Sequence, residues 1–213
     1  MTIFPASDRS LLVTFGNEIS LESWRSVHHL TSALAGVRGI LNLHPAFASV
    51  LIDFDPRLCD HQAVESWVRE RLRSVPAEMP APSRTIEISV RFGGEAGPDL
   101  PDVARNAGLT APDAVELFTS TVYLVYFVGF STCFPYLGGL PAELAMPRLG
   151  APRKHVPEGS VAIGGAQAGV YPLASPGGWR LIGRTPLRLF DPHASPPALL
   201  RMGDQVRFRA EHS

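Results

Sequence analysis

The sequence predicts an α+β protein in two parts, a small N-terminal α/β sandwich (βαββα(β)) followed by a C-terminal β-barrel. Two observations lead to this prediction. Residues 1–82 hold 3 glycines and 6 prolines, whereas residues 83–213 hold 16 glycines and 14 prolines, which typically separate short strands. Helical hydrophobic periods occur twice in the first part, while short alternating segments dominate the second. We therefore assign residues 1–82 and 83–213 to two domains, joined by the proline-containing segment 76–82.

The first part is predicted to run strand, helix, strand, strand, helix. Residues 11–15 form the first strand, and a helix capped by Ser20 and ended by Gly36 follows it. Residues 39–44 and 49–54 form an antiparallel hairpin, and Asp60 caps the second helix. Residues three or four positions apart give each helix one apolar face. These faces are Trp24, Val27, Leu30 and Leu34, and Val64, Trp67, Val68, Leu72 and Val75.

In the second part, a strand over residues 85–90 points Ile86, Ile88 and Val90 inward, although this strand can belong to either domain. Two short helices are expected over residues 99–107 and 112–118. Further strands are predicted at 122–128, 160–163, 169–173, 179–185 and 205–210. Because these strands are short and separated by Gly/Pro turns, a closed barrel is favoured over an open sheet.

Composition excludes several classes of protein. The chain carries 19 Lys+Arg and 20 Asp+Glu with no basic stripe, which argues against nucleic acid and against an anionic membrane surface. The longest apolar run, residues 122–130, is shorter than the ~20 residues that span a bilayer. The N-terminus has no charged region followed by an apolar stretch, so we expect a cytoplasmic protein. Cys59 and Cys133 are expected to be free thiols, and no metal site is predicted.

The segment GFSTCFPYLGG at residues 129–139 is the most distinctive stretch. Phe134 and Tyr136 can form a rigid wall for a ligand, or they can plug one end of the barrel. The same segment resembles a G-x-S-x-G nucleophile elbow whose last glycine is replaced. A Ser131 or Cys133 nucleophile is disfavoured because no partner histidine is identifiable nearby.

Three arginines and a glutamine are candidates for ligand binding. Arg148 and Arg153 stand in a repeated Pro-Arg spacing and can clamp a carboxylate or phosphate, although solvated surface arginines are the alternative. Arg184 follows an apolar strand and can reach the barrel mouth. Gln167, in a glycine-rich turn, can place its amide against a polar ligand.

The segment GGEAGPD at residues 93–99 contains two carboxylates before a helix. Asp99 is expected to cap that helix, which leaves Glu95 as a weak catalytic candidate. The segment is no phosphate loop, because a Walker A sequence needs Gly-Lys followed by Ser or Thr, and Lys154 is the chain's single lysine. If ATP is used, another chain is expected to bind most of it.

A long ordered series of motifs resembles one known family. The motifs are GGE at 93–95, GPDL at 97–100, GF at 129–130, FPYLGG at 134–139, PR at 147–148 and 152–153, VP at 156–157, SV at 160–161, YP at 171–172, SPGGW at 175–179 and IGRTPLRLFD at 182–191. They resemble the allophanate hydrolase subunit 1 family, which includes the 5-oxoprolinase subunit PxpB and the kinase inhibitor KipI. The resemblance is dense over residues 86–192 and covers the N-terminal part by pattern only.

The resemblance implies a cyclophilin-like barrel and a partner subunit with a homologous barrel. It also implies that the chain is a subunit of an ATP-dependent 5-oxoprolinase. That enzyme includes a third chain and opens the lactam of 5-oxoproline to L-glutamate. ATP is then bound by the complex rather than by this chain. Two alternatives remain open. One is a KipI-type inhibitor that docks on a histidine kinase, and the other is a component of allophanate hydrolysis or urea amidolyase acting on a different amide.

The chain departs from the family's pattern at five positions. Thr132 and Cys133 replace Pro and Gly in the aromatic loop, Phe118 stands where a histidine is common, and Ala166 and Ala168 alter the usual G-G-Q-T-G. We expect these changes to alter the substrate or to abolish catalysis while leaving the barrel intact. The leading hypothesis assigns Phe134 and Tyr136 to the pocket wall, Arg148, Arg153 or Arg184 to an anionic group, and Gln167 to the amide.

Overall fold

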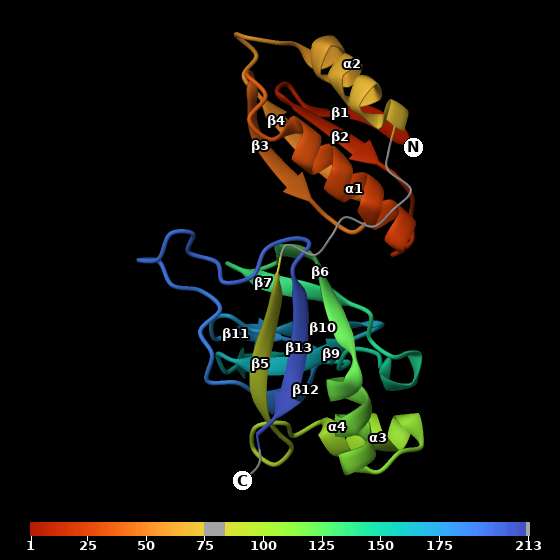
Figure 1. Ribbon diagram of the computed structural model, residues 1–213, viewed down its shortest axis with the longest axis vertical. Helices are drawn as coiled ribbons and strands as arrows, with labels where there is room; N and C mark the ends of the chain where they lie inside the picture. Colours follow the sequence, from red (N-terminus) through yellow and green to blue (C-terminus); the bar gives the residue numbers. More distant parts are fainter. Residues whose placement is uncertain (75–83, 212–213) are drawn as a thin grey trace. The chain divides into compact units, whose positions relative to one another are not determined.

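The computed structural model describes residues 1–74 and 84–211, which fall into two compact units, Met1–Ala81 and Pro82–Ser213 (Figure 1). The linker predicted at residues 76–82 and the predicted helix-face residue Val75 lie outside the described residues. Within the described part of the chain, no helix is long and apolar enough to cross a membrane. Each unit buries its own set of apolar side chains.

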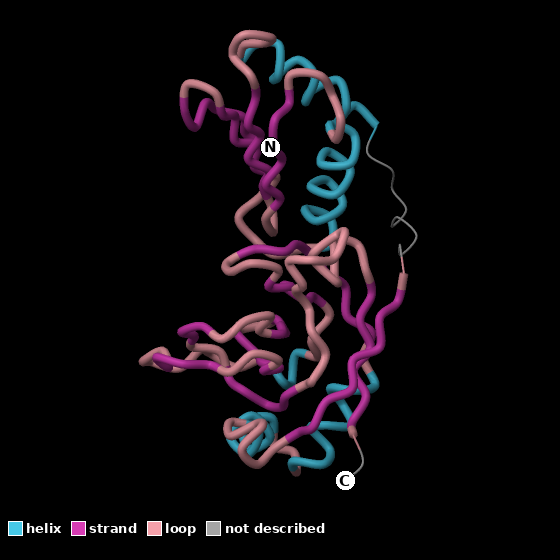
Figure 2. Tube along the Cα trace, turned by 90° about the vertical axis from the view of Figure 1, so that its left-hand side faces the viewer, coloured by secondary structure: helices cyan, strands magenta, loops and turns pink. Residues whose placement is uncertain are grey.

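The N-terminal unit is an antiparallel sheet with two helices on one side (Figure 2). Its strands are β1 (Thr2–Ser7), β2 (Ser10–Thr14), β3 (Ile40–Pro45) and β4 (Ser49–Phe54), paired in the order β1-β2-β4-β3. Its helices are α1 (Leu21–Leu34) and α2 (His61–Arg71), and the short turn η1 (Leu72–Ser74) follows α2. Strand β1 was not predicted. It is an exposed edge strand that contains Pro5, so it lacks the alternation that marks a half-buried strand.

Side-chain caps start both helices as the sequence predicts. The Ser20 Oγ accepts the Ser23 N–H at 3.1 Å, and the Asp60 carboxylate accepts the Ala63 N–H at 2.8 Å. The predicted apolar faces pack on the sheet, where the buried residues are Trp24, Val27, Leu30, Leu34, Val64 and Val68 from the helices and Leu11, Val13, Val50, Ile52 and Phe54 from the strands. Burial of these faces is the main contribution to the stability of the unit.

The C-terminal unit is a closed barrel. Among the described residues its strands are β5 (Thr85–Phe92), β6 (Val122–Gly129), β7 (Phe134–Gly138), β9 (Ser160–Gly164), β10 (Gln167–Val170), β12 (Arg180–Arg184) and β13 (Gln205–Ala210). They pair in the order β10-β7-β6-β13-β5-β12-β9. Strands β8 (Arg153–Val156) and β11 (Ser175–Gly177) form a separate two-stranded sheet. The predicted fold class, an α+β sandwich followed by a β-barrel, is confirmed.

Two helices, α3 (Leu100–Ala107) and α4 (Ala111–Ser120), lie at one end of the barrel (Figures 1 and 2), and the short turn η2 (Ala142–Leu144) packs near α3. Gly108 ends α3 with φ 68°, a left-handed conformation that favours glycine. Phe118 of α4 is buried among the rings of Phe92, Tyr123 and Phe208. Phe118 therefore fills the barrel end that these helices cover.

The barrel closes by pairing its first and last strands, β5 and β13, in parallel along their lengths (Figure 1). The seam is reinforced by Asp204, whose side chain is fully buried. Its carboxylate accepts hydrogen bonds from the Arg84 guanidinium at 2.9–3.2 Å and from the Arg201 backbone N–H at 2.9 Å. The strand predicted at residues 85–90 thus belongs to the barrel, with Ile88 and Val90 fully buried and Ile86 partly so.

Candidate functional site

A cavity of about 470 Å³ opens on the C-terminal unit, and aromatic rings form most of its wall. We call it the aromatic cavity. Its lining includes Phe130, Phe134, Tyr136, Tyr171 and Trp179, with the exposed Arg148 beside them. The rings come from the β6–β7 loop, from β7, and from the two ends of the segment 171–179 that contains β11. The small sheet β8–β11 supplies the neighbouring Gly177.

The aromatic cavity lies on the outer face of the barrel strands. Ile163 and Ala168 point into the barrel core, so their neighbours Ala162 and Gly169 point outward. Ala162 packs in the cluster that contains Phe134 and Trp179, and Gly169 lies directly under the Phe134 ring. The rings therefore do not plug the barrel end, which was one of the two alternatives for Phe134 and Tyr136.

Phe134 is the centre of the ring cluster. Its ring centroid lies 5.1 Å from that of Tyr136, 5.1 Å from that of Tyr171 and 5.3 Å from that of Trp179, all edge to face. Phe134 itself is 1% exposed, so it forms the base of the cavity rather than its rim. Phe130, 68% exposed, extends the ring cluster to the surface.

Glycines in the underlying strands make room for these rings. A Cβ atom on Gly164 would lie 2.4 Å from the Trp179 indole, and one on Gly169 would lie 2.6 Å from the Phe134 ring. Both positions belong to the glycine-rich segment 164–169, which the sequence predicted as a turn leading into a strand that starts at Gly169. The lack of a side chain at these two glycines lets the rings lie directly on the backbone of β9 and β10.

Arg148 supplies positive charge at the aromatic cavity. Its guanidinium carbon lies 5.6 Å from the centroid of the Trp179 ring, a cation–π distance. Among the described residues no carboxylate lies within ion-pair distance of Arg148, so its charge is available to an anionic ligand group. This placement agrees with the predicted role of Arg148, which stays a prediction.

The tyrosine hydroxyls of the cavity stay protonated at neutral pH. Burial raises the pKa of Tyr136 and of Tyr171 above the usual value of 10. Arg148 opposes this shift at both tyrosines, and a hydrogen bond with the Trp179 backbone also opposes it at Tyr171, but burial is the larger effect. The cavity therefore presents apolar faces, neutral hydroxyls and one cation, a combination suited to a small ligand with an apolar part and an anionic group.

Arg153, the second arginine of the Pro-Arg spacing, makes an ion pair with Asp99. Its Nη2 lies 2.8 Å from Asp99 Oδ1, and its Nη1 donates to the Trp179 carbonyl at 3.4 Å. Asp99 Oδ2 accepts the Leu181 N–H at 2.7 Å. Asp99 stands at the predicted N-cap position, but its side chain makes no cap hydrogen bond because it is directed to Arg153 and β12. The pair fixes the strand that follows Trp179.

Gln167 is 5% exposed and shares a strand face with Gly169, the face that carries the rings. Its Nε2 has no hydrogen-bond partner among the described residues. Gln167 does not line the aromatic cavity. Arg184 lies elsewhere, in a separate polar pocket, and the exposed Glu95 lines neither. The sequence candidates thus divide, with Phe134, Tyr136 and Arg148 together and Gln167, Arg184 and Glu95 outside that cavity.

The loop at residues 130–133 carries the elbow-like residues. The Ser131 Oγ is buried with no partner among the described residues, so no histidine activates it there. Burial raises the pKa of the Cys133 thiol, which disfavours the thiolate. Phe130 and Cys133 adopt φ values of 61° and 63°, the left-handed region in which non-glycine residues are strained. The family's glycine at the Cys133 position fits that backbone.

Sequence reasoning did not propose Tyr171 or Trp179 as site residues. Trp179 is the only tryptophan of residues 83–213, and it ends the SPGGW motif at residues 175–179. Tyr171 directly follows β10 and carried no comparable signal. Its ring reaches the cavity because Gly177 leaves the space: a Cβ there would lie 2.3 Å from the Tyr171 hydroxyl.

Residues 1–200 match the family described as carboxyltransferase domain, subdomain C and D. The chain is 44% identical to the B subunit of 5-oxoprolinase from Escherichia coli O157:H7 over 89% of this chain and 87% of that protein. It is 39% identical to the B subunit of 5-oxoprolinase from Bacillus subtilis over 94% of this chain and 89% of that protein. The chain belongs to the family of 5-oxoprolinase B subunits.

Solved structures agree with this membership. The structure of TTHA0988 superposes with a TM-score of 0.84 at 36% identity, covering 97% of this chain, which spans only 41% of TTHA0988. A conserved protein of Pyrococcus horikoshii, PH0987, is 41% identical, with a TM-score of 0.60 over 100% of this chain and 98% of that protein. Urea carboxylase of Kluyveromyces lactis, at 21% identity and a TM-score of 0.75, shares the fold.

The departures from the family's pattern fall in different places. Phe118 and Ala168 are buried in the barrel core, and Ala166 is exposed in the turn between β9 and β10. Thr132 and Cys133 lie in the loop between Phe130 and Phe134, next to the aromatic cavity. In this member of the 5-oxoprolinase family, therefore, the changes nearest the cavity are those at Thr132 and Cys133.

Proposed function

We propose that this chain is a subunit of an ATP-dependent 5-oxoprolinase complex, which opens 5-oxoproline to L-glutamate together with a homologous-barrel partner and a third subunit. The observation that carries the proposal is the identity of 39–44% to the B subunits of two 5-oxoprolinases over at least 87% of their length. Proteins this similar over their full lengths share a fold and commonly a role. The aromatic cavity is proposed to be this chain's share of a composite site.

The chemistry of the cavity supports this assignment. 5-Oxoproline is a small lactam ring with apolar methylenes, an amide and a carboxylate. Arg148 is placed to pair with the carboxylate, and the rings of Phe134 and Trp179 are placed to cover the methylenes. The neutral hydroxyls of Tyr136 and Tyr171 are suited to donate to the lactam oxygen. Such a donor polarises the carbonyl carbon towards attack.

ATP supplies the free energy of lactam opening in this proposal. The chain has no Gly-Lys-Ser/Thr sequence, so we assign most of the ATP contacts to the other subunits. Hydrolysis adds one water across the C–N bond of the lactam, giving the γ-carboxylate and the free amine of glutamate. The residues of this chain bind and orient the substrate, and a partner barrel supplies groups that the aromatic cavity lacks.

The test is ATP-dependent conversion of 5-oxoproline to glutamate in extracts of the native cell. Wild type, a deletion of this gene, and the deletion with the gene restored are compared. We expect activity to be lost and then regained. Activity that persists in the deletion, in a cell without a second copy of the gene, contradicts the proposal.

A matched pair of variants tests the cavity. Arg148→Gln is expected to raise the KM for 5-oxoproline by roughly tenfold or more, because a charge-assisted hydrogen bond to the carboxylate is lost. The control is Arg105→Gln, which removes the same charge from an exposed ion pair with Asp102 on α3. Equal kinetics for the two variants would exclude Arg148 from substrate binding without touching the subunit assignment.

Allophanate chemistry is the second candidate. The chain is 27% identical to the urea amidolyase of Lachancea kluyveri over 98% of this chain, which covers 13% of that protein. Release of ammonia from allophanate by the purified complex, without turnover of 5-oxoproline, would favour it. Inhibition of a histidine kinase by the isolated chain, with neither amide reaction detectable, would favour the KipI-type alternative.

A further inference from the structure

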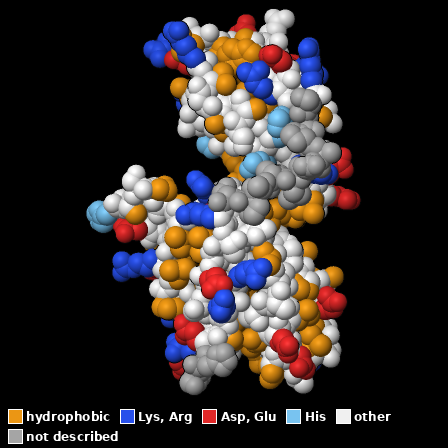
Figure 3. Space-filling model, in the orientation of Figure 1, with side chains coloured by type: hydrophobic (Ala, Val, Ile, Leu, Met, Phe, Trp, Pro, Cys, Tyr) orange, Lys and Arg blue, Asp and Glu red, His pale blue; other side chains and the backbone are white. Residues whose placement is uncertain are grey.

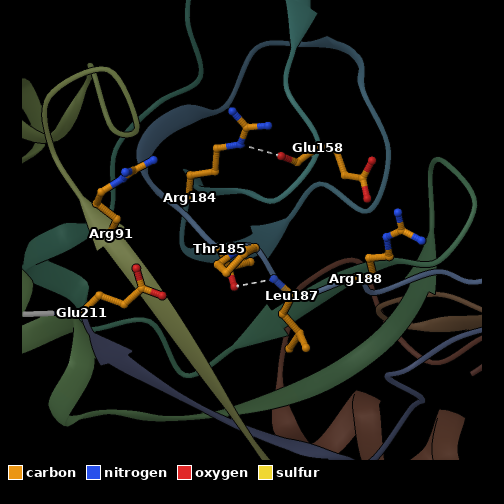
Figure 4. A pocket seen from close by; sticks show the side chains of 8 residues that line it. Arg91, Glu158, Arg184, Thr185, Leu187, Arg188 and Glu211 are labelled. Carbon is orange, nitrogen blue, oxygen red and sulfur yellow. Dashed lines mark hydrogen bonds between the residues drawn. The ribbon is translucent and has the colours of Figure 1, made fainter.

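A second pocket, of about 430 Å³, lies where β5 and β12 pair (Figure 4). Arg91 comes from β5, Arg184 from the end of β12, and Arg188 from the segment that follows. Glu158 and Glu211 also line it. We call it the arginine pocket. It shares no lining residue with the aromatic cavity, and nothing in the proposed reaction uses it.

Two of its arginines are directly opposed. Arg184 is the register partner of Arg91 in the antiparallel pair β12–β5. Side chains opposite each other in such a pair lie on one face with Cβ atoms about 5 Å apart, and like charges in this position repel. A neutral pair would be more stable in the chain alone. An anion bound close to both guanidinium groups would offset this repulsion.

Arg184 is held in a fixed orientation. Its Nε donates to the backbone carbonyl of Glu158 at 2.8 Å, the contact drawn in Figure 4. Among the described residues its terminal nitrogens have no partner, so this end of the guanidinium is left to bind a ligand. Arg188 is brought to the pocket by a turn in which the buried Thr185 accepts the Leu187 N–H at 3.1 Å. Fixed donors reduce the entropic cost of binding.

The pocket's own carboxylates do not neutralise these arginines. Within the described part of the chain, neither Glu158 nor Glu211 makes an ion pair with Arg91, Arg184 or Arg188. Elsewhere on the barrel, arginines commonly do have such partners: Arg84 pairs with Asp204, Arg153 with Asp99 and Arg209 with Glu87. Charged side chains of both signs are otherwise interspersed on the face shown in Figure 3. Three arginines without an ion-pair partner among the described residues therefore line one concave site.

We propose that the arginine pocket binds a phosphate group, held between Arg91 and Arg184. A carboxylate presents two oxygens in one plane and satisfies a single guanidinium fork. A tetrahedral phosphate presents three or more oxygens in different directions, which two opposed guanidinium groups can contact together. Its double negative charge also offsets the repulsion between the two arginines.

The test is calorimetric titration of the full chain with inorganic phosphate and with ATP, in phosphate-free buffer at low salt. Arg91→Gln and Arg184→Gln are each expected to weaken binding by roughly tenfold or more, since each removes a charge-assisted contact. The matched control is Arg209→Gln, which removes the same charge from β13, where Arg209 pairs with Glu87. It is expected to change the affinity by less than about twofold.

Thermal unfolding without ligand separates binding from folding. Because Arg91→Gln removes a like-charge pair, the variant is expected to unfold at the same temperature as wild type or higher, while gaining less from added phosphate. ATP that binds more tightly than phosphate and displaces it would assign the site to a nucleotide's phosphates. Phosphate that binds while ATP does not would assign it to the free ion.

Absence of saturable binding of either compound overturns the proposal. So does equal weakening by Arg209→Gln and the two pocket variants, because a general charge effect would then explain the binding. These measurements use the isolated chain and no 5-oxoproline. Failure here therefore leaves the proposed oxoprolinase role standing, and failure of that role leaves the phosphate site standing.

Discussion

Replacing Gly164 with alanine tests whether the wall of the aromatic cavity rests on bare backbone. The new Cβ would lie 2.4 Å from two atoms of the Trp179 indole and 2.7 Å from its Nε1. The ring would have to retreat by about 1 Å to reach ordinary van der Waals separation. It has little space for this, since it is 5% exposed and packs against Phe134 and Tyr136.

Overpacking of this kind costs about 1–3 kcal/mol. We expect Gly164→Ala to lower the free energy of unfolding of the barrel by that amount and to change the tryptophan fluorescence. The control is Gly150→Ala, where nothing lies within 4 Å of the added Cβ and the backbone is not left-handed. Its stability is expected to stay within about 0.5 kcal/mol of wild type.

Urea denaturation followed by fluorescence and by far-UV circular dichroism measures both effects. Trp179 is the only tryptophan in the barrel unit, and Trp24 and Trp67 report on the N-terminal unit. The transition that moves with Gly164→Ala should therefore be the one that carries the Trp179 signal. If Gly164→Ala matches Gly150→Ala in both stability and spectrum, Trp179 does not lie on Gly164 and the described cavity wall is wrong.

Three further outcomes follow from the structure. Asp99→Ala should lower the free energy of unfolding of the barrel by about 2–4 kcal/mol in urea denaturation, because it leaves the Leu181 N–H and Arg153 without their partner. The control Asp102→Ala, in an exposed ion pair, should lower it by less than about 0.5 kcal/mol. Equal losses would contradict the assigned contacts. Hydrogen bonds from Arg57 lower the pKa of Asp55 from 3.8 to about 2 in the folded chain. Between these two pH values the unfolded chain binds a proton at Asp55 that the folded chain does not bind. The contribution of Asp55 to stability is therefore present above about pH 4 and is lost as the pH falls through 2. The difference in unfolding temperature between wild type and Asp55→Asn should thus shrink over that range, and a difference constant with pH would refute it. Phe118→His, which restores the family's common residue, should destabilise the barrel by about 1–3 kcal/mol. The described neighbours of this side chain are apolar rings and the Tyr123 hydroxyl, which already donates to the Phe118 carbonyl. Unchanged stability would show that a hydrogen-bond partner for the imidazole is available.

The helices and most barrel strands were predictable because local signals agreed with the final packing. Ser20 and Asp60 cap their helices as their types and positions indicate, and the faces beginning at Trp24 and Val64 are buried. Strand β1 was missed because nothing in its exposed, proline-containing sequence alternates. Strand β7 was read as a loop because glycines and Pro135 surround its aromatics, although Phe134 and Tyr136 pair with β6.

The candidate site was predictable in kind but not in arrangement. Aromatic residues between glycines predicted the ring wall, and Arg148 was identified from its Pro-Arg spacing. Arg153 shares that spacing, yet it is paired with Asp99, 54 positions away in the sequence. No local pattern reveals such a partner. Likewise, Arg91 and Arg184 lie opposite each other because of the register of β5 and β12. These strands are far apart in the sequence, and only the closed barrel determines their pairing.

The seam between β5 and β13 also determines how the barrel can fold. These neighbouring strands are joined through contacts up to 122 residues apart in the sequence, and Asp204 anchors Arg84 across the same seam. Closing so long a loop is entropically costly and makes folding slow. During synthesis, strand β5 emerges long before its partner does. Until β13 is available, the edge of β5 stays unpaired on that side and prone to wrong association, so the ring can close only after β13 has been synthesised.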